Sequence, residues 1–172
     1  ASVTNISYAS NGSVDGSNVF YAIATDSLGN ATSCTATNLN YFLDTVRPAT
    51  AGSPSIASGY HNSTSTSPTF TWSTPSDPAP SSGLNRIEVA ISTSATGGNE
   101  AAGWTSLGIA TVSHAYASGL SLSQCVDYYA TIRSVDDAGN TSLNAVTSAF
   151  RVDTTGPTAP AFSIGTDQSN SQ

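Results

Sequence analysis

The sequence contains no lysine and no methionine, and only 9% of its 172 residues are charged. Four arginines face eleven carboxylates, which gives a net charge of -7 at neutral pH. Such a surface repels phosphate backbones and anionic lipid headgroups, so the composition disfavours nucleic acids and membrane surfaces as partners. No apolar run approaches the ~18 residues that a membrane-spanning helix needs, so no membrane span is expected.

Catalytic patterns are missing as well. The two histidines, His61 and His114, have no Cys, Asp or Glu close to them in sequence. No nucleophile elbow, zinc-binding helix, phosphate loop or dinucleotide fingerprint occurs. The nearest look-alike, residues 119–123, lacks the second glycine of a nucleophile elbow. We therefore predict that the chain is not an enzyme, with no catalytic residue and no cofactor apart from a metal ion considered below.

Small hydroxyl side chains are what the sequence has most of, with 30 serines and 23 threonines. Together with plentiful Val, Tyr, Gly and Pro, they favour β-structure with many turns. The two cysteines, Cys34 and Cys125, occupy places that are not equivalent in the repeat described next, and we expect them to lie far apart. A disulfide needs Cα atoms within about 7 Å, so we do not expect one between them.

An internal repeat organises the chain. Residues 43–48 (L-D-T-V-R-P) resemble residues 152–157 (V-D-T-T-G-P), and residues 20–30 parallel residues 130–140, each ending in D-x-x-G-N. The same order of strand, turn, strand and D-T-x-x-P linker therefore occurs twice. This predicts the C-terminal part of a preceding unit over 1–45, a complete unit over 46–152, and the first strand or linker of a following unit over 153–172.

Alternating apolar residues and turn signals predict seven short strands in the complete unit, at 53–57, 69–73, 86–93, 104–107, 110–116, 127–135 and 145–152. With no helical stretch between them, the expected fold is an all-β antiparallel β-sandwich. The inward positions of these strands and of the loop before the sixth strand predict a core of Phe70, Trp72, Ile87, Val89, Ile91, Leu120, Leu122, Tyr128, Ala130, Ile132 and Phe150.

A family resemblance follows from Trp72, Leu120, Leu122, Tyr128, the D-D-x-G-N turn and the D-T-x-x-P linker. The unit resembles bacterial fibronectin-type-III and immunoglobulin-like repeats of large cell-surface proteins, such as adhesins. The resemblance implies seven short strands per unit. It also implies that Tyr128 anchors the corner before its strand by a hydrogen bond between its hydroxyl group and the backbone.

The resemblance implies a non-catalytic, extracellular or cell-surface repeat segment that acts as a stalk or fibre building unit of a bacterial adhesin. Its expected partners are neighbouring repeats, identical chains arranged head to tail, or surface glycans. The alternative is an accessory spacer or carbohydrate-binding module of a secreted glycoside hydrolase, because this scaffold hosts stalks and binding modules alike. An exposed planar row of aromatic side chains would favour carbohydrate binding.

Acidic residues near the linker predict a calcium site between units. In a sandwich of this kind the turn after the sixth strand lies at the same end of the unit as the start of the first strand. This brings Asp136 and Asp137 toward Asp44. Three carboxylates with nearby backbone carbonyls suit a hard cation that prefers oxygen ligands. The alternative is that Asp136 or Asp137 pairs with Arg47, and that D-x-x-G-N is only a turn in which Gly139 supplies a positive φ.

Trp104 is the candidate ligand-binding residue. It follows a loop rich in Gly, Ala and Asn at an expected edge strand, where an indole ring can stack on a sugar face. The alternative is that Trp104 closes the open edge of the sandwich. Tyr60 and His61, in a loop, are weaker candidates for contacting a ligand.

Overall fold

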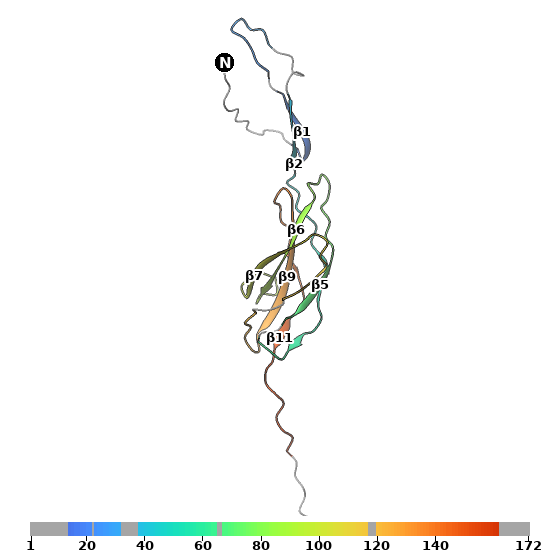
Figure 1. The fold of residues 1–172 in the computed structure, drawn as a ribbon, viewed down its shortest axis with the longest axis vertical. Helices are drawn as coiled ribbons and strands as arrows, with labels where there is room; N and C mark the ends of the chain where they lie inside the picture. Colours follow the sequence, from blue (N-terminus) through green and yellow to red (C-terminus); the bar gives the residue numbers. More distant parts are fainter. Residues whose placement is uncertain (1–13, 22, 32–37, 65–66, 117–119, 162–172) are drawn as a thin grey trace, which may run out of the picture.

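The computed structural model describes residues 14–21, 23–31, 38–64, 67–116 and 120–161. Within these ranges the chain forms eleven β-strands, and no segment forms a helix that could cross a membrane. Figure 1 shows a two-stranded hairpin (blue) at one end, a body of packed strands in the middle, and residues 153–161 leaving the opposite end. The fold class is all-β, as predicted.

The hairpin pairs β1 (Gly16–Tyr21) antiparallel with β2 (Asn38–Leu43). The rings of Phe20 and Tyr41 stack with their centroids 4.9 Å apart. Large apolar side chains that stay exposed on these two strands are Val19, Tyr21, Leu39 and Phe42. An isolated two-stranded sheet is marginally stable in water, so we expect the hairpin to contribute little stability by itself.

The body contains two sheets that share one core. The larger sheet has the order β4-β11-β9-β6-β7, with β10 also paired to β9, and the smaller sheet has the order β3-β5-β8. The strands of the larger sheet are β4 (Tyr60–His61), β6 (Leu84–Ser92), β7 (Ala102–Leu107), β9 (Asp127–Asp136), β10 (Ala145–Val146) and β11 (Phe150–Val152). Those of the smaller sheet are β3 (Gly52–Ile56), β5 (Thr69–Ser73) and β8 (Ser113–Ala115).

All eleven residues of the predicted core are buried, so that prediction is confirmed. Both sheets contribute: the ring of Phe70 on β5 lies 6.0 Å from that of Phe150 on β11. The arrangement is therefore sandwich-like. The hydroxyl group of Tyr128 accepts a hydrogen bond of 2.8 Å from the backbone N–H of Ser123, which is the corner contact expected for this residue.

Three features differ from the predictions. The last strand is not continuous, because it has one more residue than β9 between the pairs Val146–Thr131 and Phe150–Tyr128, which splits it into β10 and β11. The short strand β4 was not predicted, and it pairs parallel with β11. A buried indole N–H usually finds an acceptor, whereas that of Trp72 in the predicted core has none among the described residues.

The outer face of the larger sheet is also covered, by the loop between β6 and β7. The backbone N–H of Gly98 donates to the hydroxyl group of Thr131, which is fully buried. At Gly97, whose φ is 83°, an added Cβ would lie 2.9 Å from methyl groups of Thr131 and Val146. This close approach requires glycine, and it accounts for the full burial of Thr131 on β9.

Candidate metal centre at the linker

The linker that follows β2 is held by the body through Asp44, whose side chain is only 6% exposed. One carboxylate oxygen, Oδ1, accepts the backbone N–H of Val46 at 3.0 Å, and the other, Oδ2, accepts that of Ser82 at 2.7 Å. The carbonyl oxygen of Asp44 accepts the side-chain amide of Asn140 at 3.0 Å. Hydrogen bonds from Ser82 keep the pKa of Asp44 below its ordinary value, so this carboxylate is charged at neutral pH.

Residues next to Asp44 bind the linker both to the hairpin and to the body. The backbone N–H and hydroxyl group of Thr45 donate to Asp15, which lies just before β1, at 3.0 and 2.9 Å. Pro48 is fully buried, and the N–H of Ala49 donates to the carbonyl oxygen of Ser76 at 2.8 Å. The linker therefore has contacts with the hairpin through Thr45 and with the body through Asp44, Pro48 and Ala49.

Asp136 ends β9 and begins the predicted D-x-x-G-N turn. Its two carboxylate oxygens accept the backbone and side-chain N–H groups of Asn140, at 2.7 and 2.9 Å. Gly139 supplies the positive φ, at 94°, that this turn needs. Asp136 is only 1% exposed, so its carboxylate is removed from water almost completely.

Asp77 lies in the loop between β5 and β6. Its Oδ2 accepts the hydroxyl group of Ser81 at 2.6 Å and the N–H of Gly83 at 2.9 Å. Its other oxygen, Oδ1, is buried and accepts no hydrogen bond within the described part of the chain. A buried carboxylate oxygen without a donor is costly, and a bound cation would remove that cost.

These three aspartates form one cluster. One carboxylate oxygen from each of Asp44, Asp77 and Asp136 lies within 4.8 Å of the other two. Every donor that the structure records on these carboxylates is a neutral N–H or O–H group. Two oxygens on opposite sides of a calcium ion at ~2.4 Å are ~4.8 Å apart, so the spacing suits such an ion. The triad could bind a metal ion.

The predicted metal ligands are brought together only in part. Asp44 and Asp136 meet as expected, whereas Asp137 lies outside the cluster, where its exposed carboxylate accepts the side-chain amide of Asn85 at 2.7 Å. Asp77 takes its place and was missed. The signal for Asp77 was its position in the proline-rich loop after the second strand, since that loop lies at the same end of the body as the D-x-x-G-N turn.

The alternative pairing with Arg47 is not observed. Arg47 is exposed, and none of the ion pairs recorded among the described residues includes it. The turn that this alternative also predicted is observed, with a positive φ at Gly139. The turn and the acidic cluster are therefore compatible with each other.

Trp104 lies half-buried on β7, at the edge of the larger sheet. The guanidinium carbon of Arg133 lies 3.8 Å from the centre of its ring. Arg133 is in turn fixed by Glu88, whose carboxylate lies 2.7 Å from its guanidinium group. One ring face of Trp104 is thus occupied, which fits the alternative that it closes the edge of the sheet.

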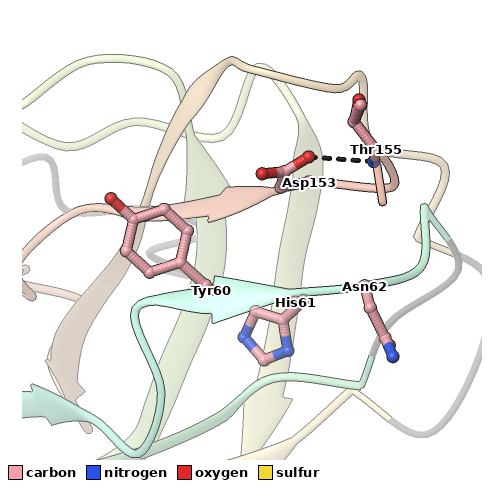
Figure 2. Close-up of a pocket in the computed structure, with 5 residues that line it drawn as sticks. All are labelled: Tyr60, His61, Asn62, Asp153 and Thr155. Atoms are coloured by element: carbon pink, nitrogen blue, oxygen red, sulfur yellow. Dashed lines mark hydrogen bonds between the residues drawn. The ribbon is translucent and has the colours of Figure 1, made fainter. Parts of the chain in front are cut away.

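The opposite end of the body carries the weaker candidates. Tyr60, His61, Asn62, Asp153 and Thr155 line an open pocket of about 530 Å³ (Figure 2). The backbone N–H of Asp153 donates to the carbonyl oxygen of His61 at 2.8 Å, so the pocket forms where the chain leaves the last strand. Cys125 is an exposed free thiol, and Cys34 lies outside the described residues.

No protein-family model and no curated protein matches the sequence.

Proposed function

We propose that the chain is a non-catalytic repeat segment of an extracellular adhesin, built from fibronectin-III-like or immunoglobulin-like units. The segment acts as a stalk or fibre building unit, and calcium stiffens the joints between its units. The observation that supports this function is the linker, which has contacts on both sides and contributes Asp44 to a triad of carboxylates in which Asp44 and Asp136 are buried and Asp77 is half-buried. A spacer needs such fixed joints, whereas a set of freely moving domains does not.

The position of the three carboxylates makes the joint sensitive to a cation. Asp44 comes from the linker, Asp77 from the loop between β5 and β6, and Asp136 from the end of β9. Without a cation their like charges repel one another at short range in a partly dry environment. A calcium ion between them would replace this repulsion with attraction and tie the linker to the body.

The environment outside cells suits such a site. Extracellular calcium modules bind the ion with dissociation constants of ~10⁻⁴–10⁻³ M, which three carboxylates and a few carbonyl oxygens can provide. An acidic chain without lysine also stays soluble and offers few sites to trypsin-like proteases. Stacked units joined by short proline-containing linkers then form a semi-rigid spacer.

The carbohydrate-binding alternative has less support from the two tryptophans. Trp72 is in the core, and Trp104 has one ring face under Arg133. An exposed planar row of aromatic rings would favour sugar binding, and neither a buried Trp72 nor a ring of Trp104 that is covered on one face supplies it with a fully open ring. We therefore favour the spacer over the binding module.

Calcium titration of the full chain tests the proposal. We expect heat of binding in calorimetry, a higher melting temperature in calcium than in EDTA, and a longer maximum dimension in small-angle scattering. Asp77→Asn removes one ligand charge while keeping an oxygen for Ser81 and Gly83, and should abolish these effects. Asp137→Asn is the matched control, since it removes an equal charge from the same end outside the cluster.

Two results would overturn the calcium-stiffened joint. The first is a wild-type chain that gives no heat with calcium and melts at the same temperature in EDTA. The second is equal loss of calcium binding in Asp77→Asn and Asp137→Asn, because general surface charge would then account for the binding.

A further inference from the structure

The linker pattern recurs after β11, and its local structure recurs with it. At the first linker the backbone N–H of Val46 donates to Oδ1 of Asp44 at 3.0 Å. At the second, the N–H of Thr155 donates to Oδ1 of Asp153 at 2.9 Å, as the dashed line in Figure 2 marks. Both aspartates therefore make the same two-residue turn with their own backbone.

The threonine that follows each aspartate is also held in the same way. Thr45 donates its hydroxyl group to Asp15, just before β1, and Thr154 donates its hydroxyl group to Oε1 of Gln124, just before β9, at 2.6 Å. In both cases the acceptor lies in the unit that comes before the linker, just ahead of a strand of that unit. The contacts between the second linker and its own unit are thus already made.

The contacts on the far side differ between the two linkers. Asp44 is buried and its Oδ2 accepts the N–H of Ser82, whereas Asp153 is exposed and its Oδ2 accepts no hydrogen bond from the described residues. Pro48 is fully buried in the body, whereas Pro157 is exposed. The second linker therefore makes the same local hydrogen bonds as the first, but no surface among the described residues covers its Asp153 and Pro157.

We propose that residues 153–157 are a docking segment, and that their occupant is the linker-receiving end of a further copy of the 46–152 unit. In the docked state Oδ2 of Asp153 accepts the N–H of the copy's counterpart of Ser82. Its carbonyl oxygen accepts the amide of the counterpart of Asn140, and Pro157 becomes buried as Pro48 is. This inference rests on the proposed function, since it names the partner of the same kind of joint.

The receiving side is preformed as well, which favours docking without rearrangement. In the hairpin, the backbone and side-chain N–H groups of Asn30 donate to the two carboxylate oxygens of Asp26 at 2.9 and 2.8 Å. These are the bonds that Asn140 makes with Asp136 in the assembled joint. Because the turn forms at Asp26 with no linker on it among the described residues, joining costs little ordering on either side.

The same geometry excludes one occupant. In the whole chain the receiving end of the 46–152 unit is already filled by Asp44. A second copy of the whole chain therefore offers no open receiving end of that unit. The partner is a unit whose own preceding linker is the 153–157 segment itself.

A tandem chain tests this inference. Residues 1–157 are followed directly by a second copy of residues 49–161, so that the segment 153–157 takes the place of 44–48. Asp153→Ala is compared in the tandem and in the single chain, with Asp44→Ala as the matched variant. We expect Asp44→Ala to lower the melting temperature in both, and Asp153→Ala to lower it only in the tandem.

Calcium stoichiometry separates this inference from the proposed function. One calcium per single chain and two per tandem, falling to one in Asp153→Ala, support both. One per single chain and one per tandem, with Asp153→Ala silent in both, overturn the inference and leave the proposed function standing. No calcium in either chain, with Asp153→Ala still destabilising the tandem alone, overturns the calcium joint and supports docking by residues 153–157.

A second measurement applies if the tandem does not melt cooperatively. Every buried residue of the core cluster lies within 51–152, so the piece 46–161 contains the whole core and has both an open receiving end and a free docking segment. We expect it to form head-to-tail oligomers in sedimentation, and Asp153→Ala to be monomeric. A folded, monomeric wild-type piece at high concentration would overturn the inference.

Discussion

The D-x-x-G-N turn occurs twice in this chain, at 26–30 and at 136–140, in two very different settings. The hydrogen bonds between aspartate and asparagine are the same in both, and Gly29 and Gly139 adopt φ of 87° and 94°. Yet Asp26 is exposed, while Asp136 is 1% exposed and faces two other carboxylates. The local sequence pattern therefore forms the turn, and contacts with distant segments place Asp136 in the acidic cluster.

The strands beside the two turns show the same contrast. In the hairpin Phe20 and Tyr41 stack on each other, while Leu39 stays 66% exposed. In the body Ile132 and Phe150 are fully buried, because the smaller sheet covers them. Corresponding strands are thus unequally buried, so we expect them to differ in stability, and the following predictions test that difference from the largest expected effect to the smallest.

Truncating an aromatic ring should separate the two regions most clearly. Phe150→Ala removes a fully buried ring and should cost about 3–5 kcal/mol of unfolding free energy. Phe20→Ala acts on the hairpin, outside that core, and should change the main transition by less than about 0.5 kcal/mol. Chemical denaturation measures both, and equal losses would show that hairpin and body unfold as one unit.

Replacing the turn asparagines gives the next effect. Asn140→Ala removes the side-chain amide that donates to two buried residues, to the carboxylate of Asp136 and to the carbonyl oxygen of Asp44, at a cost of about 1–3 kcal/mol. Asn30→Ala acts on an exposed turn and should stay within about 0.5 kcal/mol. Thermal unfolding in EDTA measures both losses of unfolding free energy without any contribution from bound metal. A loss in Asn30→Ala as large as that in Asn140→Ala would contradict the prediction.

Replacing the turn glycines should reveal an equal local cost. At Gly29 and Gly139 an added Cβ meets nothing within 4 Å, so the effect of alanine is the backbone strain of a positive φ, about 1 kcal/mol at either position. We expect Gly139→Ala to lower the unfolding free energy of the body and Gly29→Ala to speed hydrogen exchange in the hairpin alone. A much larger cost at Gly139 would mean that the joint itself is disturbed.

Acidification should weaken the body by a smaller amount, through two groups. Burial raises the pKa of Glu88, but hydrogen bonds from Arg86 and Arg133 outweigh it and bring the pKa below its ordinary value. The resulting stabilisation is present above about pH 4.5 and is lost as the pH falls through the lowered value. Glu88→Gln should flatten that part of the plot of melting temperature against pH. An unchanged plot would show that the ionisation of Glu88 does not cause the decline.

The second group is His114 on β8. Burial lowers the pKa of its imidazole below the ordinary value. The unfolded chain then binds a proton more readily than the folded one, so stability should already decline below about pH 6.5. His114→Gln should remove this earlier decline without touching the one due to Glu88. A decline that persists in His114→Gln would assign it to another group.

The predictions from sequence were most accurate where one strand carries the information. The strand 69–73 was placed with the bounds that β5 has, and its alternating burial puts Phe70 and Trp72 inside. Inward positions of a strand follow from a period of two residues, whatever lies opposite. The D-x-x-G-N turns were predictable for the same reason, since aspartate, glycine and asparagine stabilise them within five residues.

The predictions failed where two distant segments decide the outcome. The break between β10 and β11 depends on register against β9, and the parallel pairing of β4 depends on where the chain crosses between sheets. The choice of Asp77 over Asp137 in the acidic cluster depends on how the loop between β5 and β6 folds back. The residues next to the β10–β11 break and to β4 do not predict these pairings, and the proline-rich loop around Asp77 indicates only the end of the body at which this residue lies.

By itself the sequence determined the all-β class, the inward faces of the strands, the two turns and the absence of familiar catalytic motifs. These depend on side-chain alternation, composition and backbone preferences that act over a few residues. Only the tertiary structure decided that Asp44, Asp77 and Asp136 share one buried place, and that Asp153 remains exposed. Carboxylates that far apart in the chain meet only when two sheets pack on one core and bring three loops to the same end.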